Sequence, residues 1–215
     1  MFQYGTAPSS TESQILSGTQ PSYYSQLVQA ANAAEVALRV SIDPERSTAR
    51  YRVREQLAGF DFPNDAVGES RNVTGAIAFT AGGQVVPEQS RVVVDLTQLT
   101  SDSNRRDNYI KRRTLGTNRF PEVVFVLREV QGLPWPAPKE GNAMFRLVGD
   151  LTVRDRTIPI VWEGSAEFNP SEATGSAKTE FTFDDIGLEK PSVMRVLSVD
   201  DEIRLELNFT VSRAG

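Results

Sequence analysis

The strongest constraint on the fold is an alternation of apolar and polar residues, with period two, in most segments after residue 35. In the clearest case, Ile203, Leu205, Leu207 and Phe209 alternate with polar or charged residues. Such alternation predicts β-strands with one dry face and one face in water. Similar segments lie at 36–42, 49–57, 73–79, 92–96, 122–128, 143–153, 158–168 and 177–183. The chain is therefore predicted to be all-β, with about eight strands and with loops at 59–68 and 184–200.

Strands with a single apolar face fit two architectures, a two-sheet sandwich or one sheet closed on itself. Many of the predicted strands approach ten residues, which is roughly 30 Å. Mostly short turns join them in simple succession, and this favours up-and-down closure. We therefore expect an eight-stranded antiparallel barrel. The interior of such a barrel has room for side chains or for one slim ligand.

One segment, 95–121, interrupts the strand pattern. It concentrates positive charge on a chain whose formal net charge is −5, with Arg105, Arg106, Lys111, Arg112 and Arg113. Ser101 or Asp102 can begin a helix here and Gly116 can end it, so the sequence predicts a short basic helix over 104–115. Asp107 and Lys111 are expected to pair weakly across one turn. Because the helix lacks a continuous apolar stripe, we expect it to lie near the barrel rim.

The N-terminal segment differs in composition from the rest. Residues 1–32 are rich in Ser, Thr, Gln and Tyr, and Glu12 is their only charged residue. Such a segment buries too little surface to offset the cost of ordering. The sequence thus predicts a flexible polar tail over 1–35 and one barrel domain over 36–215. It shows no transmembrane run of apolar residues and no visible signal peptide, which leaves both a cytoplasmic and an exported protein open.

The residue types that are missing exclude several kinds of chemistry. The chain has no cysteine and no histidine, so thiolate catalysis, zinc sites with Cys or His ligands, and histidine general bases are all absent. The acidic clusters at 184–185 and 200–202 lack the spacing of a calcium loop and are expected to serve turns. We expect no catalytic residue, no cofactor and no metal. The mild acidity of the chain argues against nucleic acid as a partner.

The inward faces of the predicted strands carry most of the large apolar side chains. The candidate pore lining is Tyr51, Val53, Ile77, Phe79, Phe125, Phe145, Leu147, Trp162, Phe181, Phe183, Leu205, Leu207 and Phe209. These residues either fill a core or surround a channel. Small residues on the same faces favour a channel, namely Ala49, Gly75, Ala143, Gly149 and Ala177.

Four ordered blocks of the sequence resemble the YceI-like family of lipid- or polyisoprenoid-binding proteins. They lie at 105–111 with 119–121, at 149–153 with 157–160, at 183–188 and at 199–203. The resemblance covers about 40–211, and Tyr109 stands where a histidine is common in the family. It implies a lipocalin-like barrel whose apolar pore holds a long isoprenoid chain. It also implies frequent export and dimerisation.

Together these observations predict a non-enzymatic protein that binds, stores or transports a long-chain apolar lipid of the polyisoprenoid type. The resemblance implies a place outside the cytoplasm, in the periplasm or envelope or secreted, and makes a homodimer one option. A phosphate or pyrophosphate headgroup is expected at the pore mouth, because arginine binds such oxygens bidentately. The residues expected to contact it are Arg105, Arg106, Tyr109, Arg112 and Arg113. The alternative is a solid-core interaction module of the cell envelope, and a lipid-modifying enzyme ranks third for want of a base.

Overall fold

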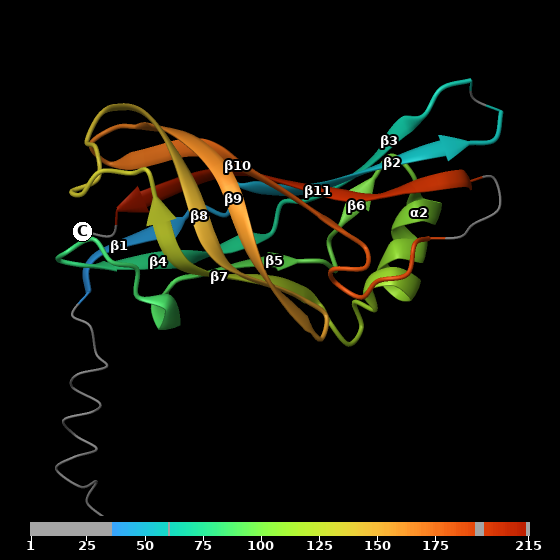
Figure 1. Ribbon diagram of the computed structural model, residues 1–215, viewed down its shortest axis with the longest axis horizontal. Coiled ribbons are helices and arrows are strands. Elements are labelled where there is room, and N and C mark those ends of the chain that lie inside the picture. Colours follow the sequence, from blue (N-terminus) through green and yellow to red (C-terminus); the bar gives the residue numbers. More distant parts are fainter. Residues whose placement is uncertain (1–35, 60, 192–195, 214–215) are drawn as a thin grey trace, which may run out of the picture. The chain divides into compact units, whose positions relative to one another are not determined.

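The structure is a computed structural model that describes residues 36–59, 61–191 and 196–213 (Figure 1). The tail predicted at 1–35 lies outside the described residues. The strands are β1 (Val36–Ile42), β2 (Thr48–Leu57), β3 (Asn64–Ser70), β4 (Val73–Thr80), β5 (Arg91–Asp95), β6 (Thr100–Ser101), β7 (Glu122–Gln131), β8 (Gly141–Val153), β9 (Arg156–Phe168), β10 (Glu172–Thr182) and β11 (Val196–Arg213). The helical elements are the 3₁₀-helix η1 (Pro87–Gln89), the α-helix α2 (Asn104–Tyr109) and the π-helix η2 (Ile110–Leu115). In the described part of the chain, no helix is long and apolar enough to cross a membrane.

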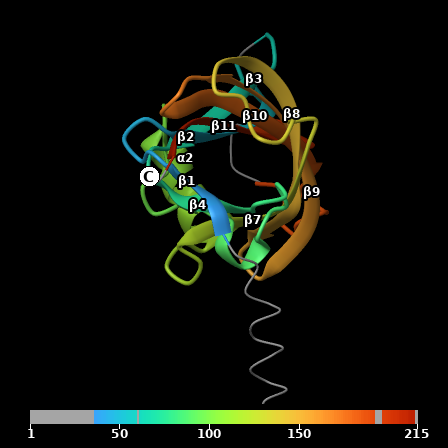
Figure 2. The same cartoon turned by 90° about the vertical axis from the view of Figure 1, so that its left-hand side faces the viewer.

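Eight of these strands form a closed antiparallel ring. Their order is β1-β4-β5-β7-β8-β9-β10-β11, and β11 pairs back with β1. The ring is visible when the barrel is viewed from one end (Figure 2). From β7 to β11 each strand pairs with the next one in the chain, and the predicted eight-stranded antiparallel barrel is confirmed. The expected simple succession fails in the first half of the ring, where β1 pairs with β4 and the predicted strand 49–57 lies outside the ring.

The last strand, β11, is long enough to border two strands in succession. Its C-terminal end pairs with β1, where Val211 faces Ile42, and the preceding part pairs with β2, where Asn208 faces Thr48. Beyond β2 the sheet continues through β3 to β6. The ring therefore carries an extension of β2, β3 and β6 on the same side as α2 (Figure 1).

Two of the predicted loops are in part strands. The predicted loop 59–68 contains most of β3, and the predicted loop 184–200 contains the start of β11. On β3 the buried positions are Ala66, Gly68 and Ser70. Because these side chains are small or polar, the strand shows no apolar alternation and was predicted wrongly.

The basic helix occupies 104–115, as predicted, although its N-cap is Ser103 rather than Ser101 or Asp102. The Ser103 side chain accepts a hydrogen bond from the Arg106 backbone N–H, which satisfies one free donor of the first turn. Gly116 ends the helix in the left-handed conformation, with φ 63°.

The helix is attached to the barrel by polar contacts. Asp107 is only 6% exposed and accepts hydrogen bonds from the Ser101 backbone N–H at 3.1 Å and from the Ser101 hydroxyl at 2.5 Å. The predicted pairing of Asp107 with Lys111 is therefore wrong, and Lys111 Nζ donates to the Thr97 carbonyl at 3.2 Å. At the far end, Arg154 from the β8–β9 turn donates to the Thr114 carbonyl at 3.2 Å.

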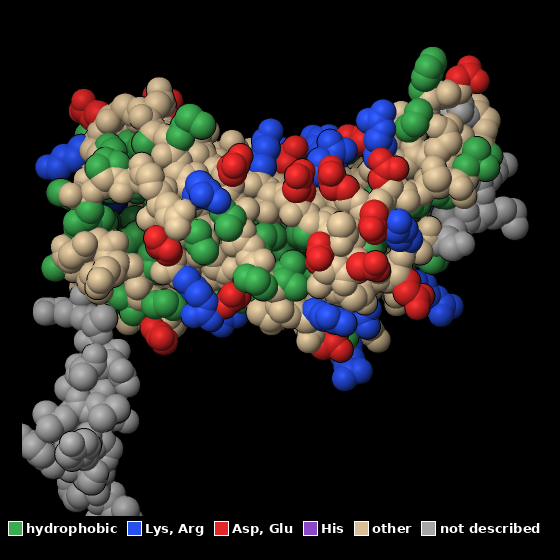
Figure 3. All heavy atoms as spheres, in the orientation of Figure 1, with side chains coloured by type: hydrophobic (Ala, Val, Ile, Leu, Met, Phe, Trp, Pro, Cys, Tyr) green, Lys and Arg blue, Asp and Glu red, His purple; other side chains and the backbone are tan. Residues whose placement is uncertain are grey.

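Ion pairs join β2 to both of its neighbouring strands. Arg50 pairs with Glu69 of β3 at 3.0 Å, and Arg52 pairs with Glu206 of β11 at 3.0 Å. Acidic and basic side chains are likewise interspersed over the face shown in Figure 3. Two arginines of β2 are thus matched by acids on both neighbouring strands.

Candidate functional site

A cavity of about 850 Å³ lies inside the barrel. Its wall includes residues of the β7–β8 loop and of the end of β9, at one end of the barrel, and residues of α2 and of the end of β2 at the other (Figure 1). Pockets that enclose small ligands commonly measure about 300–1,000 Å³. The interior is therefore not the solid core of the alternative reading, and it has room for a ligand.

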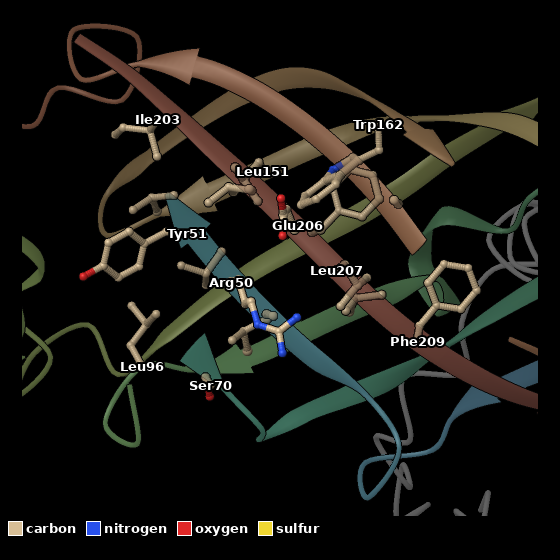
Figure 4. Close-up of a pocket in the computed structure, with 18 of the residues that line it drawn as sticks. Arg50, Tyr51, Ser70, Leu96, Leu151, Trp162, Ile203, Glu206, Leu207 and Phe209 are labelled. Atoms are coloured by element: carbon tan, nitrogen blue, oxygen red, sulfur yellow. The ribbon is translucent and has the colours of Figure 1, made fainter. Parts of the chain in front are cut away.

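All thirteen residues of the candidate pore lining border this cavity. They are contributed by strands from β2 to β11 and by the turn after β10. Figure 4 shows side chains from three strands around a common space: Leu151 of β8, Trp162 of β9, and Leu207 and Phe209 of β11. The wall is thus built from apolar side chains that are distant in sequence.

Glycines on neighbouring strands make room for the aromatic rings of the wall. A Cβ atom at Gly164 would lie 2.5 Å from Cε2 of Phe145, and one at Gly68 would lie 2.2 Å from Cε1 of Tyr51. Each ring therefore occupies the volume that a side chain on the adjacent strand would take. Rings that lie against the sheet in this way leave more of the barrel interior open.

The small residues expected to open the channel do so in different ways. Ala49 and Ala177 border the cavity directly. Gly149 does not border it but receives the Phe125 ring, which lies 2.8 Å from where its Cβ would be. Gly75 and Ala143 are not among the residues of the cavity wall.

Trp135, in the loop between β7 and β8, borders the end of the cavity that is opposite the helix. Its indole N–H donates to the Ala81 carbonyl at 2.9 Å, and its ring lies 5.4 Å from that of Phe79. At Gly83, with φ 83°, a Cβ would lie 2.4 Å from the Trp135 ring. The only sequence signal for this role is a tryptophan that stands between two prolines.

The helix forms part of the cavity wall near the other end. Of the five residues expected at the pore mouth, Arg105, Arg106 and Tyr109 border the cavity, whereas Arg112 and Arg113 are exposed and do not. In a regular α-helix, at about 100° per residue, these five side chains would lie near one another, but η2 is π-helical and has more residues in each turn. The altered turn changes the direction of the side chains after Tyr109.

Arg106 is engaged by two carboxylates. Its Nη2 donates to Glu55 Oε1 at 2.7 Å, and its Nη1 pairs with Asp102. Burial alone would lower the pKa of Arg106, but the two carboxylates raise it above its ordinary value. Glu55 is itself only 8% exposed and borders the cavity. Sequence reasoning missed it, although a charged residue at an inward position, between Val53 and Leu57, is a readable signal.

Most of the other charged residues in the cavity wall are also engaged. The wall contains Arg50, Glu55, Arg105, Arg106, Glu172, Glu206 and Arg213. All of them except Arg105 and Arg213 form an ion pair with a side chain of opposite charge. Arg213 instead donates a hydrogen bond to the Pro138 carbonyl at 2.9 Å. Within the described ranges, Arg105 is thus the one charged wall residue without an ion pair or hydrogen bond.

The acidic cluster at 184–185 lies in the turn that follows β10. Asp185 accepts hydrogen bonds from the backbone N–H and the hydroxyl of Thr182, both at 2.7 Å, and these bonds lower its pKa. This is the turn role expected from the sequence. No group of three or more metal-binding side chains occurs among the described residues.

The comparisons with known proteins give the same architecture. None of the curated proteins matches the chain. Among solved structures, a polyisoprenoid binding domain from Saccharophagus degradans superposes with a TM-score of 0.65 at 8% identity, covering 82% of this chain and 99% of that one. BcnA from Burkholderia cenocepacia gives 0.58 at 12% identity, covering 79% and 98%. The YceI protein of Campylobacter jejuni gives 0.54 at 13% identity, covering 74% and 91%. At these identities the likeness shows a shared fold.

The family assignment comes from the sequence itself. The model of the YceI-like domain matches residues 41–211, which include nearly all of the barrel and the basic helix. The chain belongs to the YceI-like domain family.

Proposed function

We propose that this protein is a non-enzymatic carrier that holds one long-chain apolar lipid, of the polyisoprenoid type, inside its barrel. The observation that carries the proposal is the cavity of about 850 Å³, most of whose lining residues are apolar. A polyisoprenoid binding domain with the same fold, from Saccharophagus degradans, supports this choice of ligand.

Burial of the ligand supplies the binding energy in this proposal. Transfer of about 400 Å² of hydrocarbon from water, at ~25 cal/mol per Å², contributes about 10 kcal/mol before losses. Ordering of a flexible chain and loss of its free motion offset part of this gain. Affinity then needs no hydrogen bond, and the length and width of the cavity select the ligand.

The proposal also covers location and assembly. We infer that the carrier works outside the cytoplasm, in keeping with the YceI-like resemblance, and that a homodimer forms through faces or loops, since the strands of the ring are paired on both sides. Fractionation of cells that express the full gene, followed by light scattering of the purified protein, tests the two statements separately.

The experiment that tests lipid binding is organic extraction of the purified protein followed by mass spectrometry. We expect close to one apolar lipid per chain. An Ala49→Trp variant, whose new side chain projects into the cavity, should yield little lipid. Met144→Trp is the matched control, because Met144 is 81% exposed and does not border the cavity. A folded wild-type protein that yields no stoichiometric lipid, and gains none from added isoprenoids, would refute the proposal in favour of the interaction module.

A further inference from the structure

At the helix end of the cavity, the charged groups and the neutral polar groups differ in how they are engaged. Arg106 and Glu55 are paired at 2.7 Å, and Arg106 also pairs with Asp102. By contrast, the hydroxyls of Tyr51 and Tyr109, which also border the cavity, form no hydrogen bond with the described residues. The groups available to a ligand here therefore include the two phenolic hydroxyls and the exposed Arg105.

A phosphate group is disfavoured at this position. Phosphate recognition by arginine relies on free guanidinium N–H groups that face two oxygens at once. Both terminal nitrogens of Arg106 already donate to carboxylates. In addition, the buried Glu55 carboxylate would repel a second anion where water screens the repulsion poorly. Arg105 remains, but its exposed position lets water screen its charge.

We propose that the polar end of the bound lipid, at the helix end of the cavity, is an uncharged hydroxyl or carbonyl group that hydrogen-bonds to Tyr51. The proposal rests on the proposed lipid-binding function and narrows its ligand to isoprenoid alcohols or quinones rather than isoprenoid phosphates. It revises the phosphate expected from the sequence, because that expectation treated Arg106 as a free cation.

Tyr51 is well suited to this role. Its ring is held against β3 at Gly68, and in Figure 4 its hydroxyl points away from Trp162. Arg106 and Glu55 lie near enough to influence the Tyr51 phenol. Burial raises the pKa of Tyr51, and the nearby acids Asp107, Glu55 and Asp102 add to this although Arg106 opposes it. The phenol is thus kept neutral, able to donate to a carbonyl or to exchange hydrogen bonds with an alcohol.

The test compares two probes that differ only in the head, geranylgeraniol and geranylgeranyl monophosphate, added to delipidated full-length protein. Binding is followed by tryptophan fluorescence, because the chain has two tryptophans and both Trp135 and Trp162 border the cavity. We expect the alcohol to bind about tenfold more tightly than the phosphate, because the Glu55 carboxylate repels the phosphate and such charged interactions contribute about this much.

Three variants locate the effect. Tyr51→Phe keeps the ring on Gly68 and removes the hydroxyl, so alcohol affinity should fall about fivefold while phosphate affinity stays unchanged. Glu55→Gln removes the buried negative charge, so phosphate affinity should rise about tenfold. Asp150→Asn is the matched control, because Asp150 is likewise paired with an arginine, Arg128, but neither residue borders the cavity, and it should change neither affinity.

The outcomes separate this inference from the proposed function. If the phosphate binds more tightly than the alcohol, or if Tyr51→Phe and Glu55→Gln leave the preference unchanged, the neutral-head inference is wrong while lipid binding stands. If neither probe binds to folded protein, the proposed function fails as well. Circular dichroism melting of each variant confirms that a lost affinity does not reflect unfolding.

Discussion

Gly164 and Phe145 form a pair in which a missing side chain sets the width of the cavity. A methyl group at Gly164 would lie 2.5 Å from the Phe145 ring, so the ring must move. We expect Gly164→Ala to displace the ring into the cavity, to weaken isoprenoid binding several-fold and to cost about 1–3 kcal/mol of stability. Fluorescence titration and thermal melting measure the two effects. Gly82→Ala is the control, since its nearest neighbour would be 3.8 Å away. Unchanged binding in Gly164→Ala would contradict this account of the wall.

Leucines of the barrel differ in whether they face packed atoms or the cavity. Leu127 of β7 has no exposed surface and does not border the cavity, whereas Leu207 of β11 does. We expect Leu127→Ala to cost about 2–5 kcal/mol of unfolding free energy, because it removes close contacts and leaves a void. Leu207→Ala should cost clearly less, since part of its surface already lacks neighbours. Urea denaturation of both variants decides the matter, and equal losses would indicate that the interior is packed solid.

At the scale of elements, the helix 104–115 is held by the buried carboxylate of Asp107, which accepts two hydrogen bonds from Ser101. We expect Asp107→Ala to leave these donors unsatisfied at a cost of about 1–3 kcal/mol. The loss should be local, with faster amide hydrogen exchange over 104–115 and little change in β8 and β9. Asn108→Ala, at an exposed position of the same helix, is the control. Exchange that rises uniformly over the barrel would show that the helix does not open by itself.

Two turns are joined by Arg46, which lies between Asp43 in the β1–β2 turn and Glu172 at the start of β10. Hydrogen bonds from Arg46 lower the pKa of both carboxyls. A lowered pKa contributes stability above the unfolded value, about 4, and that stability is lost as the pH falls through the folded value. Relative to wild type, Arg46→Met should therefore melt at a lower temperature at pH 7, and the difference should shrink as the pH falls below about 4. Arg112→Met is the control, and a pH-independent difference would refute the ion-pair explanation.

The sequence predicts strands well where apolar and polar side chains alternate, and poorly where they do not. The long strands β8 and β9 and the helix follow from alternation and from end signals such as Gly116. Strand β3 is missed because its inward residues are small or polar, so its sequence shows no apolar alternation. Its pairing with β2 depends on backbone hydrogen bonds, which the sequence does not reveal. All thirteen predicted lining residues border the cavity, because the period of two determines which side chains of each strand point inward. The Arg106–Glu55 pair is not, because it joins residues 51 positions apart.

The domain that the structure describes is a ring of strands around a cavity, and this affects how its stability arises. The first and last strands of the ring meet over only three residue pairs, including Val40 with Arg213 and Ile42 with Val211. Side chains around the cavity have fewer neighbours than those of a filled core, so the wall gains less dispersion energy than its apolar content allows. A ligand inside the ring supplies those contacts to the native state alone.

Binding of a lipid should therefore raise the melting temperature of the entire barrel. With free ligand at about 100 times its dissociation constant, the native state gains about 2.7 kcal/mol. For a domain of this size that gain corresponds to a shift of about 5–11 °C. Calorimetry of delipidated protein, with and without geranylgeraniol, measures the shift. Ala49→Trp, with its cavity obstructed, should melt at the same temperature in both conditions. An equal shift in that variant would mean that the lipid stabilises the barrel from its outer surface, whereas a shift confined to wild type ties the stability of the ring to occupation of its interior.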